Sequence, residues 1–475
     1  MILIKNVKLI RNLMTGYHRK NTRIFLEPSA LEAAGFKVGD QISQIVTQDA
    51  VILRVSAEKT NHKISKRKRP SWSYERPLYE SYSEEITMVL LPRSRVDILI
   101  SEGMIVIREE RSFDLFVIGK PQLQGGELKK LRLYSGPSGA GFATAAAVDT
   151  GLYEAVGGMD IWPEAVDAYM HNFKSGCMYL GDLTRKHSDY IPEVDVCWLS
   201  PSCFEYSSLG VMAKGVTEGH GPHYARSVLA SGASAVMIEQ VPAYFKSTSY
   251  MHLKKLLQPF FPFMHETIIN AYDIGSVASR TRGYAVFFRD QNDFEWPQLP
   301  KLPIHRRKTV GQVIGKDWDL GEWRSIEGTV MHGLLHKEGN NNIKSDKNHT
   351  LVGLDSKLIS AFVANYKRYQ VTSSYLKHPT EENMWRPFRS DEIAAFLNVP
   401  SFYEFPDWMP EGIKVKLLGQ SVDCDVAKSI QIEVAVALMG LRYRQLAKSD
   451  PVEVMTEELL FEKDGQGAFY FNELH

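Results

Sequence analysis

The sequence predicts an α/β protein in which a small β-rich unit precedes a larger parallel sheet with crossover helices. From Leu131 to about Arg289, short apolar runs alternate with helical stretches, which is typical of parallel strands connected by helices. From Arg23 onwards, short alternating runs bounded by turn residues indicate β-strands instead. From about Asp290 to Trp385 neither rhythm persists, which predicts an irregular insertion. In such parallel sheets the ligand-binding and catalytic residues lie at the carboxyl ends of the strands.

The composition is that of an ordinary folded protein with room for several domains. The chain has 475 residues, of which 44% are hydrophobic and 24% charged. Lys plus Arg (56) balance Asp plus Glu (56), so a nucleic acid would have to be bound by a local basic patch. No run approaches the roughly 20 apolar residues that span a bilayer, and the first twenty residues lack the pattern of a signal peptide. We therefore expect a cytoplasmic protein without a membrane partner.

Four dispersed cysteines argue against a disulfide framework and against a metal site. Cys177, Cys197 and Cys424 lie in apolar surroundings and are interpreted as packing residues. Cys203 differs, because it follows the apolar strand VDVCWLS and Pro201 in a loop rich in Ser and Gly. A thiolate at that position can meet a ligand.

The β-rich N-terminal region predicts a degenerate internal repeat, with units at about 20–57 and 85–118. Between the units, residues 63–69 are strongly basic and precede Trp72 and Tyr74. Two interpretations of this segment are about equally supported, a solvated linker and a phosphate-binding segment.

Three strand ends together predict a nucleoside-binding crevice. The first strand runs into a glycine-rich turn that contains Tyr134, Ser135, Gly136, Ser138 and Gly139. Glycines there let the backbone approach a ligand at a helix N-terminus. The next strand ends in Asp160, roughly 20 residues on, where an acid can bind a ribose diol, and the third ends at Asp182. Each acid alone could equally be a cap or turn residue, so the prediction rests on their order.

Two further strand ends carry charged residues. The apolar run SAVMIEQ ends in Glu239, and Arg280 and Arg282 lie two apart where the strand YAVFF begins. Residues two apart in a strand face the same side, so both guanidinium groups are expected to point one way. An exposed charged edge is the alternative.

These elements, in this order, resemble the cytosine-5 DNA methyltransferase family. The resemblance covers about Leu131 to Leu438 and includes YSGPSGAG as the cofactor loop, Asp160 and Asp182. The family's Pro-Pro-Cys, Glu-Asn-Val and Arg-x-Arg motifs appear as Pro201-Ser202-Cys203, Glu239-Gln240-Val241 and Arg280-Thr281-Arg282. Two late segments, RPFRSDEIAAFLNVPSFYEFP and the one from Gly419, resemble the closing motifs.

The resemblance implies a Rossmann-like S-adenosyl-methionine-dependent methyltransferase domain that acts on flipped cytosine in double-stranded DNA. It implies a catalytic core at 131–289, a target-recognition region at 290–385 and a C-terminal part at 386–475 that completes the core. The implied catalytic residues are Cys203, Glu239, Arg280 and Arg282. The implied cofactor residues are Tyr134, Ser135, Gly136, Ser138, Gly139, Asp160, Ile161, Asp182, Pro201, Gln420, Ser421 and Val422. S-adenosyl-methionine is the implied cofactor, and no metal is expected.

Departures from the family pattern leave alternatives open. Ser202 replaces a proline, Gln240 an asparagine, Ala278 a frequent glutamine and Gln420 an asparagine. A catalytically weakened DNA-binding regulator is one alternative, and an enzyme that uses RNA or a modified sulfonium donor is another. The N-terminal units, together residues 1–120, resemble the AbrB/MazE-type swapped-hairpin DNA-binding fold. That resemblance suggests a homodimer through this domain, and the whole pattern suggests a prokaryotic or phage-encoded enzyme that can have a cognate restriction endonuclease.

Overall fold

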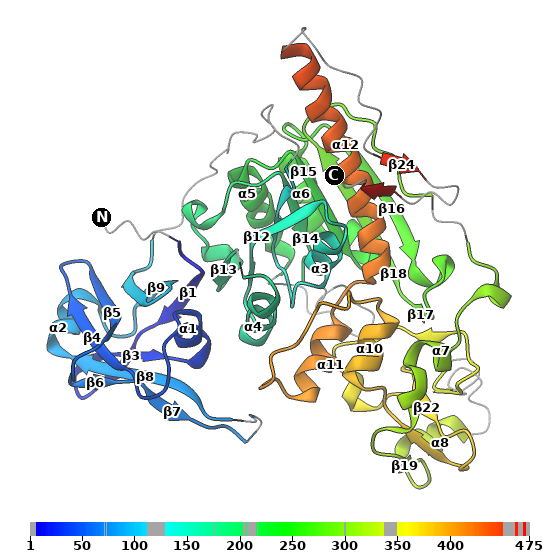
Figure 1. Ribbon diagram of the computed structural model, residues 1–475, viewed down its shortest axis with the longest axis horizontal. Helices are drawn as coiled ribbons and strands as arrows, with labels where there is room; N and C mark the ends of the chain where they lie inside the picture. The colour runs from blue at the N-terminus through cyan, green and yellow to red at the C-terminus, as the bar shows by residue number, and fades with distance from the viewer. Residues whose placement is uncertain are drawn as a thin grey trace.

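The computed structural model describes residues 6–111, 129–298, 301–336, 349–449, 461–463 and 469–471, apart from residues 71, 73, 175, 203–205, 207–214 and 216. Figure 1 shows a blue N-terminal domain, a green central sheet and a yellow-to-orange part that carries the late helices. Within these described residues no helix is long and apolar enough to cross a membrane.

The strands of the predicted catalytic core, called the catalytic sheet below, have the order β13-β12-β11-β14-β15-β18-β16 within the large sheet. Neighbouring strands from β13 to β15 pair in parallel, whereas β18 is antiparallel to β15 and β16. The strands are β11 (Leu131–Ser135), β12 (Tyr153–Asp160), β13 (Cys177–Leu180), β14 (Val196–Leu199), β15 (Ala235–Gln240), β16 (Phe263–Asn270) and β18 (Thr281–Phe288). The predicted Rossmann-like sheet is confirmed, and β14 and β15 are buried along their whole length, as expected for a sheet covered on both faces.

Crossover helices connect these strands, as the alternating sequence pattern predicts. They are α3 (Phe142–Asp149), α4 (Pro163–Asn172), α5 (Gly221–Ser231) and α6 (Thr248–Leu257). The long helix α12 (Cys424–Ser449), orange in Figure 1, lies beside α3, and the Gln431 Nε2 donates to the Ala143 carbonyl at 2.8 Å. Helix α12 therefore packs against α3, the helix that follows the glycine loop.

The N-terminal domain contains the same β-α-β-β order twice. The first copy is β3 (Asn21–Leu26), α1 (Pro28–Ala33), β4 (Gln41–Val46) and β5 (Ala50–Ser56), and the second is β8 (Arg76–Ser83), α2 (Glu84–Val89), β9 (Arg95–Ser101) and β10 (Met104–Glu109). Equivalent strands pair with each other, β3 with β8 and β5 with β10, both antiparallel. This pairing gives the domain an internal two-fold arrangement. The second copy includes a strand that begins before residue 85, and the expected stretch 112–118 lies outside the described residues.

The basic segment between the two copies is partly ordered by its own domain. The short strands β6 (His62–Lys63) and β7 (Ser65–Arg67) pair with β4 and β8 respectively. The Arg69 guanidinium lies 3.1 Å from the Glu27 carboxylate, and Lys66 lies 3.1 Å from Glu75. Part of the positive charge is therefore neutralised inside the domain.

One strand joins the two domains into a continuous sheet. Strand β1 (Leu9–Met14) pairs in parallel with β13 on one side and antiparallel with β9 on the other. The thirteen-stranded sheet consequently runs from β16 through β13 and β1 to β6. A single apolar cluster contains Leu9 and Ile100 from the N-terminal domain together with Val166 and Tyr169 from α4.

The described residues of 290–385 form a small irregular body, which lies at the lower right of Figure 1, whereas the N-terminal domain lies at the lower left. It contains α7 (Val310–Ile314), α8 (Val330–His336) and a small sheet of β19 (Arg324–Ser325), β20 (Leu351–Val352), β22 (Tyr375–Lys377) and β23 (Met384–Arg386). The short strand β17 (Ala278–Ser279) pairs in parallel with β21 (Ile359–Ser360) and so connects this body to the catalytic sheet. The helices α10 (Ser390–Phe396) and α11 (Glu411–Gly419) follow.

Candidate active site

The glycine-rich turn lies between the end of β11 and the start of α3. Gly141 caps the helix with a φ of 85°, and a Cβ there would lie 2.6 Å from the Tyr169 ring. Only glycine therefore fits this close, left-handed turn. Gly139 has a φ of 53° and open space where a Cβ would be. The backbone at Gly139 is thus accessible to a ligand at the N-terminus of α3.

Asp160 at the end of β12 holds this turn in place. Its Oδ2 accepts from the Gly139 N–H at 2.8 Å and its Oδ1 from the Trp162 N–H at 2.9 Å. Burial raises the pKa of the Asp160 carboxyl, and the backbone N–H groups oppose that rise. The Ile161 N–H also stabilises this carboxylate, and because its two oxygens together have about four acceptor positions, acceptor capacity remains for a hydroxyl group.

Ile161 directly follows Asp160, and Asp182 lies just beyond the end of the neighbouring strand β13. Ile161 is 67% exposed although it directly follows a mostly buried strand, so it offers an apolar surface at the sheet edge. The Asp182 Oδ1 accepts from both the backbone N–H and the hydroxyl of Thr184 at 2.8 Å and caps a short helical turn. The capping role that the sequence allowed for Asp182 is therefore observed.

The side chains of Tyr134 and Ser135 point into the protein. The Ser135 hydroxyl pairs with that of Thr144 at 2.7 Å, and the Tyr134 hydroxyl is hydrogen-bonded to the buried Lys186 amine. Desolvation lowers the pKa of Lys186 to about 7. A bound ligand would meet these two residues through their backbone.

Gln240 holds the loop that leads to Cys203. The side-chain amide of Gln240 donates to the Pro201 carbonyl, and its Oε1 accepts from the Val241 N–H at 2.7 Å. Pro201 and Gln240 are both buried. Cys203 itself lies outside the described residues. The residue that departs from the family pattern thus fixes the backbone two positions before the predicted nucleophile.

Glu239 and Arg282 form an ion pair at the ends of two neighbouring strands. The Arg282 Nε lies 3.0 Å from the Glu239 Oε1, and the Glu239 residue is only 4% exposed. Burial raises the pKa of the Glu239 carboxyl, whereas the charges of Arg282 and Arg280 oppose the rise. A carboxyl with a raised pKa holds a proton more readily than an ordinary carboxyl and can share it with a substrate.

The structure separates the two arginines that the sequence places on one face. The guanidinium group of Arg280 is buried and donates to the carbonyls of Phe362, at 3.1 Å, and Ser421. The reason is that Arg280 lies at the break between β17 and β18, which pair with different partners. Arg282 contacts Glu239, while Arg280 connects the catalytic sheet to the irregular segment at Phe362 and to the late segment at Ser421.

The late segment 419–422 closes over the same end of the sheet. A Cβ on Gly419 would lie 2.3 Å from the Val363 carbonyl oxygen, so this close approach requires glycine. Gln420 is exposed, Ser421 binds Arg280 through its carbonyl, and Val422 is buried. The Tyr403 hydroxyl donates to the Ala140 carbonyl at 2.7 Å, so a late residue also supports the glycine turn.

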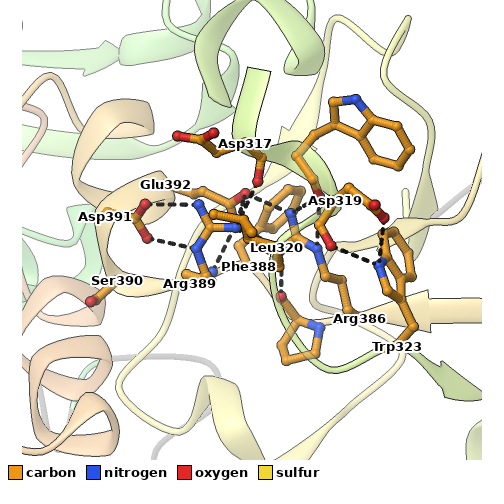
Figure 2. A network of polar contacts seen from close by, with 12 residues as sticks. Asp317, Asp319, Leu320, Trp323, Arg386, Phe388, Arg389, Ser390, Asp391 and Glu392 are labelled. Carbon is orange, nitrogen blue, oxygen red and sulfur yellow. Dashed lines mark hydrogen bonds and ion pairs between the residues drawn. The ribbon is translucent and has the colours of Figure 1, made fainter. Parts of the chain in front are cut away.

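A buried ion pair anchors the irregular segment to α10 (Figure 2). The Arg386 guanidinium binds the Glu392 carboxylate through two nitrogens at 2.6 and 2.8 Å, and its Nε donates to the Trp318 carbonyl at 3.1 Å. Arg389 reaches the Leu320 carbonyl at 2.8 Å. Sequence reasoning noted this segment as a motif but did not assign these roles, nor those of Gln240 and Tyr403. The alternation of Arg and acidic residues in RPFRSDE was the available signal.

The sheet order and the strand-end site define a Rossmann-like methyltransferase. The sequence profile of the C-5 cytosine-specific DNA methylases matches residues 129–435, and the chain belongs to this family. Members of the family use S-adenosyl-methionine. The profile begins at residue 129, so the AbrB-like identity of the N-terminal domain stays a prediction.

One solved structure with a TM-score above 0.5 supports the fold, and two further structures are similar at lower scores. The S. pombe Dnmt2 methyltransferase is 19% identical and superposes with a TM-score of 0.51 over 66% of this chain and 99% of that one. The Entamoeba histolytica methyltransferase EhMeth is 19% identical, with a TM-score of 0.48 over 67% and 99%. A putative DNA modification methyltransferase encoded within an E. coli prophage is 15% identical, with 0.48 over 65% and 100%. A search of the curated proteins gives no match.

Proposed function

We propose that this protein transfers a methyl group from S-adenosyl-methionine to the 5-carbon of a flipped cytosine in duplex DNA, through a covalent adduct with Cys203. The observation that carries the proposal is the buried Glu239–Arg282 pair beside the loop that Gln240 fixes at Pro201. An acid, a cation and a loop leading to a thiol are what covalent activation of a pyrimidine requires.

The residues at the strand ends fit the cofactor. Exposed Ile161 offers a surface for an adenine ring, Asp160 has acceptor capacity for a ribose diol, and the open backbone at Gly139 can accommodate the methionyl part. Segment 420–422 would close the pocket. The bound cofactor supplies an electrophilic methyl group on a sulfonium.

The chain's own groups make cytosine reactive. The base must leave the duplex stack to enter the site. The Cys203 thiolate attacks the 6-carbon, and the displaced electron pair makes the 5-carbon nucleophilic. Glu239 hydrogen-bonds the ring nitrogen and the exocyclic amine and supplies the proton that neutralises the ring, while Arg282 orients Glu239. After methylation the proton on the ring nitrogen returns to Glu239, the 5-proton leaves to base, and the electrons of its bond expel the thiolate.

Sequencing of modified cytosine tests the proposal. Plasmid DNA from cells expressing the protein should show one methylated cytosine context by bisulfite sequencing, and DNA from cells expressing Cys203→Ala should show none. Purified protein offered RNA and DNA in parallel, with a labelled methyl donor, distinguishes the two substrates. Methylation of RNA alone, or of neither polymer by folded protein that binds the cofactor, would contradict the proposal.

A further inference from the structure

The segment that carries Asp182 is held by the N-terminal domain. Arg185, three residues beyond Asp182, donates from its Nε to the Glu110 Oε1 at 2.7 Å and from a second nitrogen to the Glu110 Oε2. The Asn12 side-chain amide donates to the same Glu110 Oε1 at 2.9 Å. Glu110 follows β10 and Asn12 lies on β1, so both partners belong to the N-terminal domain.

The far end of the same segment is fixed in a similar way. The Tyr190 hydroxyl donates to the Asp97 Oδ2 at 2.7 Å and accepts from Arg108 at 3.0 Å. Asp97 on β9 is only 2% exposed, and its other oxygen accepts from Asn12 at 3.1 Å. Asn12 therefore links the two anchors, and the segment 182–190 is tied to the N-terminal domain at Arg185 and at Tyr190.

The electrostatics connect the anchor to the site. The Glu110 carboxylate raises the pKa of Arg185, and the charge of Asp182 contributes in the same direction. Arg185 thus hydrogen-bonds Glu110 of the N-terminal domain and also interacts electrostatically with Asp182, the predicted cofactor residue. Strand β1 pairs in parallel with β13, from Leu9 opposite Met178 to Arg11 opposite Leu180. This pairing places the end of β1 beside the start of the segment that carries Asp182.

We propose that the N-terminal domain is a structural part of the cofactor site, in which Asn12, Asp97 and Glu110 are positioning residues that hold Asp182 and its turn against the nucleoside half of the ligand. The proposal rests on the proposed function, because it takes the strand-end site to be the S-adenosyl-methionine site. It assigns to this domain a role in cofactor binding that does not depend on DNA.

The test compares Glu110→Gln with Glu80→Gln in the full-length protein. Glu80 is itself exposed on β8 and pairs with Arg23 at 2.7 Å within the same domain, so it is the matched control. Binding of S-adenosyl-homocysteine is measured by titration calorimetry, together with kcat and the KM for S-adenosyl-methionine. We expect Glu110→Gln to weaken binding and raise this KM by about tenfold, the effect of losing a charged hydrogen bond, with kcat at saturation within about twofold. Glu80→Gln should match the wild type.

A charge exchange separates positioning from general loss of structure. Arg185→Glu and Glu110→Arg should each weaken cofactor binding, and the double exchange should restore most of it, since the pair is rebuilt with opposite polarity. Unchanged affinity in Glu110→Gln, or no recovery in the double exchange when thermal melts show a folded protein, would overturn the inference. Wild-type protein that binds neither S-adenosyl-methionine nor its product would instead overturn the proposed function on which it rests.

Discussion

Glu239 is buried beside Arg282 in a place where an acid alone would be costly. Burying a charged pair costs desolvation free energy, and removing one partner leaves an uncompensated charge. Here the pair lies at the carboxyl end of β15, next to the loop from Pro201, where a parallel sheet binds its ligands. The balance between burial, which raises the pKa of Glu239, and the two arginines, which oppose the rise, suits a group that shares a proton with a substrate.

Glu239→Gln should lower kcat for methyl transfer by about 10²- to 10⁴-fold, the usual contribution of a positioned acid. The amide keeps the shape of the side chain but cannot deliver the proton. Cofactor affinity should stay near wild type, whereas the melting temperature should fall because Arg282 loses its buried partner, so kcat is measured below both melting temperatures. Arg282→Lys provides a comparison that keeps the charge. Full activity of Glu239→Gln under single-turnover conditions would remove this residue from the mechanism.

Gln240→Ala should lower kcat by about tenfold or more, because small displacements of a reacting group are expensive. The variant loses the hydrogen bond to the Pro201 carbonyl that fixes the approach to Cys203. Gln240→Asn restores the usual family residue but has a shorter side chain, so its kcat should lie between those of the wild type and Gln240→Ala. Equal rates for all three proteins would show that the loop is held by other contacts.

Lys186 should make stability depend on pH. Burial lowers its pKa from 10.5 to about 7, so between those values the unfolded chain binds a proton that the folded protein does not. The free energy of unfolding contributed by this group therefore rises from pH 7 to pH 10.5 and is lost as the pH falls towards 7. Chemical denaturation of wild type and Lys186→Met at pH 7 and 9 checks this, since the difference between the two proteins isolates the amine. A constant difference would contradict the lowered pKa.

At the level of elements, the irregular body at 290–385 depends on a few specific anchors. Arg386 and Glu392 have side chains that are each 1% exposed and join β23 to α10. Arg280 connects the catalytic sheet to Phe362 and Ser421. A body with short strands needs such ties, because its own sheet is too small to be stable alone.

Glu392→Gln should destabilise the protein by about 3–5 kcal/mol, the cost of leaving a buried guanidinium without its anion. Asp391→Asn is the matched control, because Asp391 pairs with Arg389 at the surface and its side chain is 68% exposed. That pair should contribute less than about 1 kcal/mol. Denaturant titrations measure both, and similar losses for the two variants would contradict the anchoring role.

The sequence predicted the strand ends well because charged or glycine residues directly after apolar runs are a local pattern. It placed Asp160, Asp182 and Glu239 at one end of the sheet, where the structure has them. It could not predict that Arg280 and Arg282 separate, because that depends on β17 pairing with β21, a contact between segments about 80 positions apart. Nor could it assign Gln240, whose partner at Pro201 is distant in sequence.

For the whole molecule, the main feature is the sheet that continues through β1. The sequence indicates two separate regions, because nothing local marks β1 as a partner of β13. The core is shared as well, since residues of the N-terminal strands and of α4 belong to one apolar cluster. The Arg76 guanidinium, which binds Glu32 and lies 3.5 Å from Asp167 on α4, adds a polar contact between the domains.

The N-terminal and catalytic domains should therefore unfold in one transition. Separate domains unfold independently, whereas a shared core and sheet couple them. Differential scanning calorimetry with tryptophan fluorescence as a second probe tests this. Ile10→Pro, which removes a backbone N–H from the middle of the strand that joins the two domains, should split or broaden the transition. Two resolved transitions in the wild type would contradict the coupling.

Covalent trapping tests most directly whether Cys203 forms an adduct with cytosine in DNA. The protein is incubated with S-adenosyl-methionine and duplex DNA that contains 5-fluorocytosine in the methylated context. Fluorine cannot leave as the 5-proton does, so a cysteine-dependent enzyme stays bound to its substrate. We expect a denaturation-resistant protein–DNA adduct that forms with the wild-type protein, requires the cofactor and is absent with Cys203→Ala. A fully folded, cofactor-bound protein that methylates ordinary cytosine without forming this adduct would contradict it.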